Sequence, residues 1–243
     1  MDRKSGDHSA AGGNSLAREQ PSGWLNMNKP VGYRSTRVVE LIKRISGARK
    51  VGHGGTLDPL ASGVLPIALN GATGQAEFLM DHSKTYLFHL TFGESRDSGD
   101  ADGSILEEGG LMPGASDLEA ILANFLGFLE QRPPAYSAIR VNGKRAYDLA
   151  RKGIRVELGT RRVLINDIKF SGFVDQRTAE LVVDCGRGCY VRSLAEDIAR
   201  SLGTLGYVSK LIRLRVGDMY ATDSLRLEGL DLGKILGNLV VYR

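Results

Sequence analysis

The sequence is short of long apolar runs and of cysteine. None of its 243 residues fall in an apolar run of about 18, so no membrane-spanning helix is expected. The first residues also lack the apolar core of a secretory signal, and we therefore expect a cytoplasmic protein. Apolar residues nevertheless make up 42% of the chain, which is enough for one sizeable core.

Patterns that bind metal ions are missing as well. Cys185 and Cys189 are the only cysteines, and their C-x3-C spacing lacks the second ligand pair of a structural zinc site. The four histidines show no H-E-x-x-H or related spacing. Residues 93–104 are rich in Asp and Gly, but not in the ligand order of an EF-hand. We therefore expect no metal, and interpret the cysteines as reduced thiols near the end of a strand.

Charge is modest in total and uneven along the chain. The net charge is +4 and the pI about 9.1. Residues 29–50 hold seven Lys or Arg and one acid, and residues 131–162 hold nine against two. Between them, residues 94–119 hold eight acids and one base. Two basic segments separated by an acidic one indicate a surface that binds a polyanion, with ordinary solvated faces as the alternative.

Glycine is abundant, and it gathers around one carboxylate. Residues 52–65 have the sequence GHGGTLDPLASGVL, whose glycines can adopt positive φ or approach a ligand closely. Asp58 precedes Pro59, which disfavours a helical backbone at Asp58. Leu57, Leu60 and residues 64–69 are expected to anchor this loop in the core. Asp58 is therefore a candidate nucleophile or base, although a simple turn opened by Asp-Pro is the alternative.

Apolar periodicity predicts the elements on either side of this loop. A strand is expected over residues 24–30, and a helix from Ser35 that ends at Gly47. Residues 84–92 alternate, which places Tyr86 on one face of a strand with three further apolar residues. Capping boxes predict helix starts at Ser116-x-x-Glu119 and Ser193-x-x-Glu196. Further strands are predicted over residues 154–158, 163–174, 178–185 and 210–216, and a last helix near 228–236.

Several motifs together resemble the TruB-type pseudouridine synthases. Residues 52–65 match every fixed position of the family's G-H-x-G-T-L-D-P-x-A-x-G-V-L pattern. Residues 131–153 resemble its Q-x-P-P-x-Y-S-A signature and the glycine, tyrosine and Ala-Arg positions that follow. Residues 84–86 match K-T-Y, and residues 186–192 resemble G-x-Y-x-R. Cys189 and Ser98 stand where threonine is usual.

The resemblance implies a fold, an activity and a partner. The fold would be α+β, the pseudouridine-synthase fold, with a large mixed, mostly antiparallel sheet flanked by helices and a central RNA-binding cleft. The activity would be isomerisation of uridine 55 in the T-arm loop of tRNA to pseudouridine, by a monomer. No cofactor would be needed, because nothing is oxidised or hydrolysed. Residues 23–243 would form the catalytic domain, after a disordered tail over residues 1–22. Too few residues remain for the C-terminal PUA domain that is common in bacterial relatives.

The same resemblance implies roles for individual residues. Asp58 would attack the ribose C1′ or act as a base, kept ionised by Arg192. Tyr86 would stack on the uracil, while Tyr190 and Leu211 would close the apolar walls of the pocket. His53 would fill the space left by the flipped nucleotide or contact a flipped nucleotide, and a hydrogen bond that braces the loop is the alternative. Candidates for phosphate contacts are Lys29, Lys43, Arg44, Arg140, Lys144 and Arg145.

Three other functions fit parts of the sequence less well. A glycoside hydrolase normally needs a second carboxyl group, and Asp97 and Asp100 are expected in a solvated loop. A phosphate-binding enzyme would need G-K-[ST] in the glycine-rich loop, which is absent. A non-catalytic RNA-binding protein explains the basic segments, but not the joint match of Asp58, Tyr190 and Arg192.

Overall fold

The computed structural model describes residues 20–75, 80–154 and 156–241. The tail predicted over residues 1–22 lies outside these ranges except for its last three residues. In the described ranges, no helix combines the length and the apolar character needed to cross a membrane.

A nine-stranded sheet forms the centre of the described fold. Its main strand order is β1-β3-β12-β4-β11-β10-β7, with β2 paired to β3 and β13 paired to β12. The strands are β1 (Gly23–Lys29), β2 (Val51–His53), β3 (Ser62–Leu69), β4 (Lys84–Phe92), β7 (Gly127–Gln131), β10 (Arg161–Phe173), β11 (Thr178–Cys185), β12 (Gly206–Val216) and β13 (Met219–Tyr220). Among the described strand pairs of this sheet, only β12 and β3 run parallel. The sheet is therefore mixed and mostly antiparallel, as predicted.

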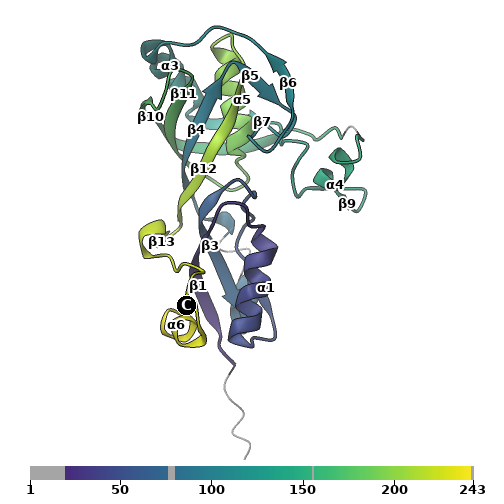
Figure 1. Ribbon diagram of the computed structural model, residues 1–243, viewed down its shortest axis with the longest axis vertical. Helices are drawn as coiled ribbons and strands as arrows, with labels where there is room; N and C mark the ends of the chain where they lie inside the picture. The colour runs from purple at the N-terminus through teal and green to yellow at the C-terminus, as the bar shows by residue number, and fades with distance from the viewer. Residues whose placement is uncertain (1–19, 76–79, 155, 242–243) are drawn as a thin grey trace, which may run out of the picture.

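Helices and two small hairpins surround this sheet. The helices are α1 (Ser35–Ser46), α3 (Ala115–Leu122), α4 (Ala146–Ala150), α5 (Val191–Ser201) and α6 (Leu232–Gly237). One hairpin joins β5 (Glu94–Arg96) to β6 (Ile105–Glu108), and the other joins β8 (Arg140–Val141) to β9 (Lys144–Arg145). Figure 1 shows α1 beside β1 and β3, α3 and α5 in the other half, and an arm with β9 and α4 that projects sideways.

Local sequence signals account for several of these elements. Tyr86, Phe88, Leu90 and Phe92 of β4 are all buried, as their alternation predicts. Helix α1 begins at Ser35 and ends before Gly47, whose φ of 66° allows its N–H to bond the carbonyl of Lys43. In both elements the buried face follows the period of the apolar residues, which the sequence alone shows.

A bulge in β12 changes which way its arginines face. Arg213 pairs with Tyr86 of β4, whereas Arg215 pairs with Thr85 after a shift in register. Because neighbouring residues of a strand face opposite sides, Arg213 and Arg215 lie on opposite faces of the sheet. Strict alternation over 210–216 would place both arginines on one face, but the bulge between them shifts the pattern by one residue.

Other predicted boundaries need correction. Helix α3 begins after Gly114, whose N–H donates to Asp117 at 3.2 Å. Helix α5 begins after Tyr190, so Ser193 lies inside its first turn and bonds the carbonyl of Arg132 instead of capping. Both predicted capping boxes are therefore wrong. The strand predicted over 154–158 does not form at its described residues, and Arg155 lies outside the described ranges. Helix α6 begins at Leu232 and not near 228.

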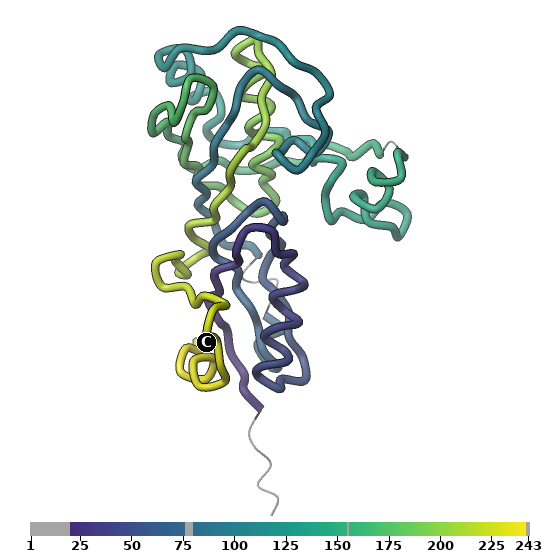
Figure 2. Tube along the Cα trace, in the orientation of Figure 1, coloured from purple at the N-terminus to yellow at the C-terminus, as the bar shows by residue number. Residues whose placement is uncertain are grey.

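The C-terminal segment lies along the outer edge of β1. The backbone groups of Trp24 and Val240 exchange two hydrogen bonds, of 2.7 and 2.9 Å. Leu225 bonds Asn26 and Asn28 in the same way. Figure 2 shows this yellow segment beside the purple start of the described chain. The first and last described parts of the chain therefore close one edge of the sheet together.

Candidate active site

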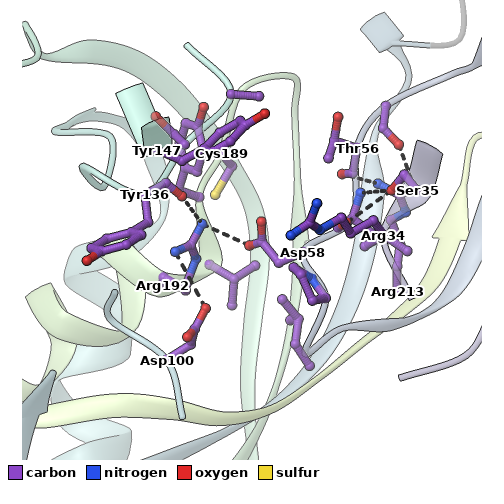
Figure 3. A pocket seen from close by; sticks show the side chains of 18 of the residues that line it. Arg34, Ser35, Thr56, Asp58, Asp100, Tyr136, Tyr147, Cys189, Arg192 and Arg213 are labelled. Atoms are coloured by element: carbon purple, nitrogen blue, oxygen red, sulfur yellow. Dashed lines mark hydrogen bonds and ion pairs between the residues drawn. The ribbon is translucent and has the colours of Figure 1, made fainter. Parts of the chain in front are cut away.

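A cavity of about 600 Å³ opens where the loop before β3 meets β4, β12 and the start of α5. Its size lies within the range of small-molecule and nucleoside pockets. Asp58, Tyr86, Tyr190, Arg192, Leu211 and His53 all line it. The structure therefore brings together six of the seven site residues predicted from the sequence. Figure 3 shows part of this cavity, with a direct contact between Asp58 and Arg192.

The loop that carries Asp58 is fixed by side chains from other elements. The hydroxyl of Ser35 accepts a hydrogen bond from the N–H of Leu57 at 2.9 Å and donates to its carbonyl at 3.0 Å. The Leu57 side chain is buried, and Ala61 is completely so. Asp58 is thus presented from a backbone that is anchored on both sides, as its apolar neighbours predict.

Asp58 and Arg192 form an ion pair. Nη2 of Arg192 lies 2.9 Å from Oδ2 of Asp58. The Arg192 side chain is 4% exposed, whereas that of Asp58 is 34% exposed, so the carboxylate is the partner that faces the cavity. Arg192 also donates to the carbonyls of Ser98 and Tyr136, at 2.7 and 2.9 Å. These contacts hold the guanidinium behind the carboxylate in one orientation.

A second carboxylate, Asp100, lies on the other side of Arg192. Its Oδ2 is 3.5 Å from Nη1 of Arg192. Its Oδ1 accepts hydrogen bonds from the hydroxyl of Ser98 at 2.7 Å and from the N–H of Asp102 at 3.1 Å. Asp100 is 4% exposed, so the expectation of a solvated loop is wrong here. The Asp and Gly content of residues 93–104 is typical of exposed turns and gives no sign of this burial.

Asp97 of the same loop stabilises the structure around Arg192. It accepts hydrogen bonds from the N–H of Ser104 at 2.9 Å and from the hydroxyl of Tyr136 at 3.1 Å. The loop over 93–104 is thereby fastened to the segment that follows β7. Both segments supply carbonyl groups to Arg192.

Burial changes the protonation of Asp58. Loss of solvent raises the pKa of Asp58 above its ordinary value, and the nearby Arg192 charge opposes this rise. The Asp100 carboxylate adds to the rise. Arg192 therefore favours the ionised form, as expected from the sequence, but its effect does not outweigh the rise in pKa that burial causes. The ionised form predominates only above a pKa higher than that of a free aspartate.

Tyr86, Leu211 and Tyr190 form apolar and aromatic walls. Tyr86 and Leu211 are buried on the neighbouring strands β4 and β12, and burial raises the pKa of Tyr86 to about 12. The backbone of Tyr190 is held by Gln131, whose amide accepts from the Tyr190 N–H at 2.7 Å and donates to its carbonyl at 3.0 Å. Gln131 was not singled out in the sequence, although it opens the motif at 131–153.

Lys29 does not fit the role predicted for it. Its side chain is fully buried, and its ammonium donates to the carbonyls of Pro30, Tyr33 and Pro59 at 2.9, 2.7 and 3.3 Å. All three donors of the ammonium are used, so a phosphate contact is wrong for this residue. Lys29 instead braces the loop that carries Asp58. Burial lowers its pKa to about 8.

His53 lies on β2 at the cavity wall. Burial, and then the charge of Arg213, lower the pKa of His53 below its ordinary value, so the ring is neutral at pH 7. Its buried Nδ1 has no hydrogen-bond partner among the described residues. The predicted loop-bracing bond is therefore not seen at this atom.

The remaining candidates for phosphate contacts are exposed, and of them only Arg145 is among the residues that line the cavity. The other exposed cations of the hairpin and of α1 are Arg140, Lys144, Lys43 and Arg44. Their position leaves them free to contact a polyanion, which Lys29 is not.

Comparisons of sequence agree with this geometry. The profile of the TruB family pseudouridylate synthase N-terminal domain matches residues 43–191. The tRNA pseudouridine synthase B of Ehrlichia canis (strain Jake) is 44% identical over 207 residues, which cover 85% of this chain and 69% of that protein. The protein of the same name from Gluconacetobacter diazotrophicus is 47% identical over 206 residues, covering 85% and 67%.

Comparisons of structure give the same fold. A chain in the crystal structure of a Cbf5-Nop10-Gar1 complex matches with a TM-score of 0.66 and 30% identity, covering 86% of this chain and 53% of that one. A chain of an H/ACA RNP bound to a substrate RNA containing 2′-deoxyuridine matches with a TM-score of 0.64 and 26% identity, covering 86% and 52%. This chain spans about half the length of those two. On its sequence, its fold and its site, the chain belongs to the TruB family of pseudouridylate synthases.

Proposed function

We propose that this chain isomerises uridine 55 in the T-arm loop of tRNA to pseudouridine, with Asp58 as the catalytic carboxylate. The observation that carries this proposal is the ion pair of Asp58 and Arg192, whose carboxylate faces a cavity of about 600 Å³. The curated relatives named tRNA pseudouridine synthase B support the choice of tRNA. This chain spans about two thirds of their length.

The reaction breaks the N1–C1′ bond of uridine, turns the uracil, and joins C5 to C1′. The proton lost from C5 balances the one gained at N1, so no oxidant or water is consumed. Asp58 either attacks C1′ or removes a proton from the sugar. Both routes need the carboxylate ionised, and Arg192 favours that form and fixes its orientation through charge-assisted hydrogen bonds.

The walls of the cavity would hold the uracil during its rotation. A uridine in a folded RNA loop must flip out to reach this site. Tyr86 would then stack on the base, an interaction on the order of 1–3 kcal/mol. Tyr190 and Leu211 would close the remaining sides, while neutral His53 would contact a neighbouring nucleotide.

RNA binding would rest on exposed cations of the arm and of α1. Arg140, Lys144 and Arg145 lie in the arm that projects beside the sheet (Figure 1), and Lys43 and Arg44 lie on α1. Contacts of this kind position the backbone without reading sequence. Within this proposal, residues 23–243 act as a monomeric catalytic domain in the cytoplasm.

Asp100 removes one argument against a glycoside hydrolase, since a second carboxylate does line the cavity. That carboxylate is nevertheless engaged by Arg192, Ser98 and the backbone of Asp102. A general acid must reach the leaving group to give it a proton, and the Asp100 carboxylate is buried and held in place by these contacts. The site therefore favours isomerisation over hydrolysis.

The test is release of tritium from tRNA that carries 5-tritiated uridine. Wild-type protein is expected to release the label, and Asp58→Asn to release none while still binding tRNA. Asp218→Asn, in the exposed turn after β12, is the matched control and should keep full activity. No release by the wild type would overturn the function, and full release by Asp58→Asn would overturn the mechanism.

A further inference from the structure

Arg213 is a buried charge that the proposed mechanism does not use. Its side chain is 1% exposed, in the middle of β12. No ion pair to Arg213 occurs within the part of the chain that the structure describes. Burying an unpaired cation is costly unless its hydrogen bonds are fully made. The contacts that compensate for this burial therefore indicate what the residue does.

The guanidinium bonds both ends of the loop that carries Asp58. Nε donates to the carbonyl of Val64 at 2.7 Å, after the loop. Nη2 and Nη1 donate to the carbonyls of Gly55 and Thr56 at 3.1 and 3.4 Å, before it. Figure 3 shows Arg213 beside Thr56, next to Asp58. The planar guanidinium thus joins the two ends of the loop, and Asp58 lies between these ends in the sequence.

The backbone of Arg213 also lies against this loop. Gly63 pairs with Arg213 where β3 and β12 run parallel. Gly63 has a φ of 101°, and a Cβ at this position would collide with the carbonyl oxygen of Arg213. The glycine is therefore needed both for its backbone angle and for the close approach of β12.

The same residue borders the base-binding wall. Arg213 is the register partner of Tyr86 across β12 and β4, and it lines the cavity itself. Burial raises the pKa of Tyr86 and lowers that of His53, and the charge of Arg213 opposes the first shift and adds to the second. Arg213 is thus in reach of the loop of Asp58 on one side and of Tyr86 on the other.

We infer that Arg213 is a positioning residue. It fixes the loop that carries Asp58 against Tyr86, so that the distance between the Asp58 carboxylate and the Tyr86 ring stays constant. This inference rests on the proposed function. A displacement of about 1 Å in an active site can cost about 100-fold in rate. Lysine cannot replace Arg213 in this arrangement, because its ammonium is a point charge and not a planar fork with donors on three sides.

The test compares Arg213→Lys with Arg215→Lys. Arg215 lies two residues further along the same strand but faces the other side of the sheet, where it bonds Thr85, Ser83 and Asp184. Three quantities are measured for each variant: the single-turnover rate with tRNA, the Kd for tRNA, and hydrogen exchange of the peptide over residues 54–61. Arg213→Lys should lose about 100-fold in rate with its Kd unchanged, and exchange faster over 54–61. Arg215→Lys should change neither the rate nor this exchange.

Each result decides the inference. A rate for Arg213→Lys within about threefold of the wild type, or an equal loss in Arg215→Lys, would overturn it. Unchanged exchange over 54–61 would do the same, even if the wild type proved inactive on tRNA and the proposed function failed separately. An Arg213→Lys protein that does not fold would make the residue a requirement of the fold, which also contradicts a positioning role.

Discussion

Gln131 offers a test in which the size of the effect follows from the structure. Its buried amide makes two hydrogen bonds to the backbone of Tyr190, the residue that caps α5. In Gln131→Leu both bonds are lost. The Tyr190 carbonyl keeps a bond from the N–H of Leu194 at 3.0 Å, so only the N–H of Tyr190 loses its single partner.

A stranded, partly buried donor costs roughly 1–3 kcal/mol. We therefore expect Gln131→Leu to lower the free energy of unfolding by about 2 kcal/mol. For a chain of this size, each kcal/mol shifts the midpoint of thermal unfolding by roughly 2–4 °C. The expected fall in Tm is then about 4–8 °C, measured by calorimetry.

Activity should fall together with stability, because Arg192 lies in the first turn of α5 and moves with Tyr190. We expect a loss of about tenfold in the single-turnover rate, smaller than for a direct contact. Glu130→Leu is the control, because Glu130 is the exposed neighbour on the same strand and such surface changes stay within about 0.5 kcal/mol. Equal Tm values for the two variants would refute the reasoning on Gln131.

Three further predictions concern pH, thiol chemistry and salt. Burial raises the pKa of Asp58, and the reaction needs its ionised form. The single-turnover rate should therefore fall as the pH drops, well before the ordinary aspartate pKa of about 3.9 is reached. A rate that stays constant down to that pH would contradict the role of Asp58. Cys189 lines the cavity while Cys185 is buried, so a maleimide should inactivate the wild type and leave Cys189→Ser active. Bound tRNA should slow the inactivation of the wild type. If Cys189→Ser were inactivated at the same rate, Cys189 would not be the thiol that reacts. The Kd for tRNA should rise steeply with salt, and replacing both Arg140 and Lys144 by Gln should reduce the slope of log Kd against log salt by about 1.4–1.8; an unchanged slope would exclude both from phosphate contacts.

Elements with local signals could be predicted from the sequence. The alternation over 84–92 gave the correct face of β4, and Ser35 and Gly47 gave both ends of α1. The pairing of Asp58 with Arg192 has no local signal, because 134 positions of sequence separate them. It came from the match of both motifs to one family.

The parts that could not be predicted depend on contacts between distant segments. Lys29 and Arg213 look like surface cations in the sequence, yet both are buried where backbone carbonyls converge on them. Asp100 lies among turn-forming residues, and only the approach of α5 buries it against Arg192. Arg213 and Arg215 face opposite sides of the sheet because of a bulge in β12, which the alternation of residues in the sequence does not show. These are the positions where tertiary structure overrides local pattern.

The segment after β13 has a consequence for how the protein folds during synthesis. An open strand edge is a template for pairing with other molecules, and β1 stays open until Leu225 and Val240 reach it. During synthesis these residues are made some 200 positions after β1, so a growing chain carries an unprotected edge until the segment from Leu225 to Val240 has left the ribosome. Shortening the chain before Leu225 would make that aggregation-prone condition permanent.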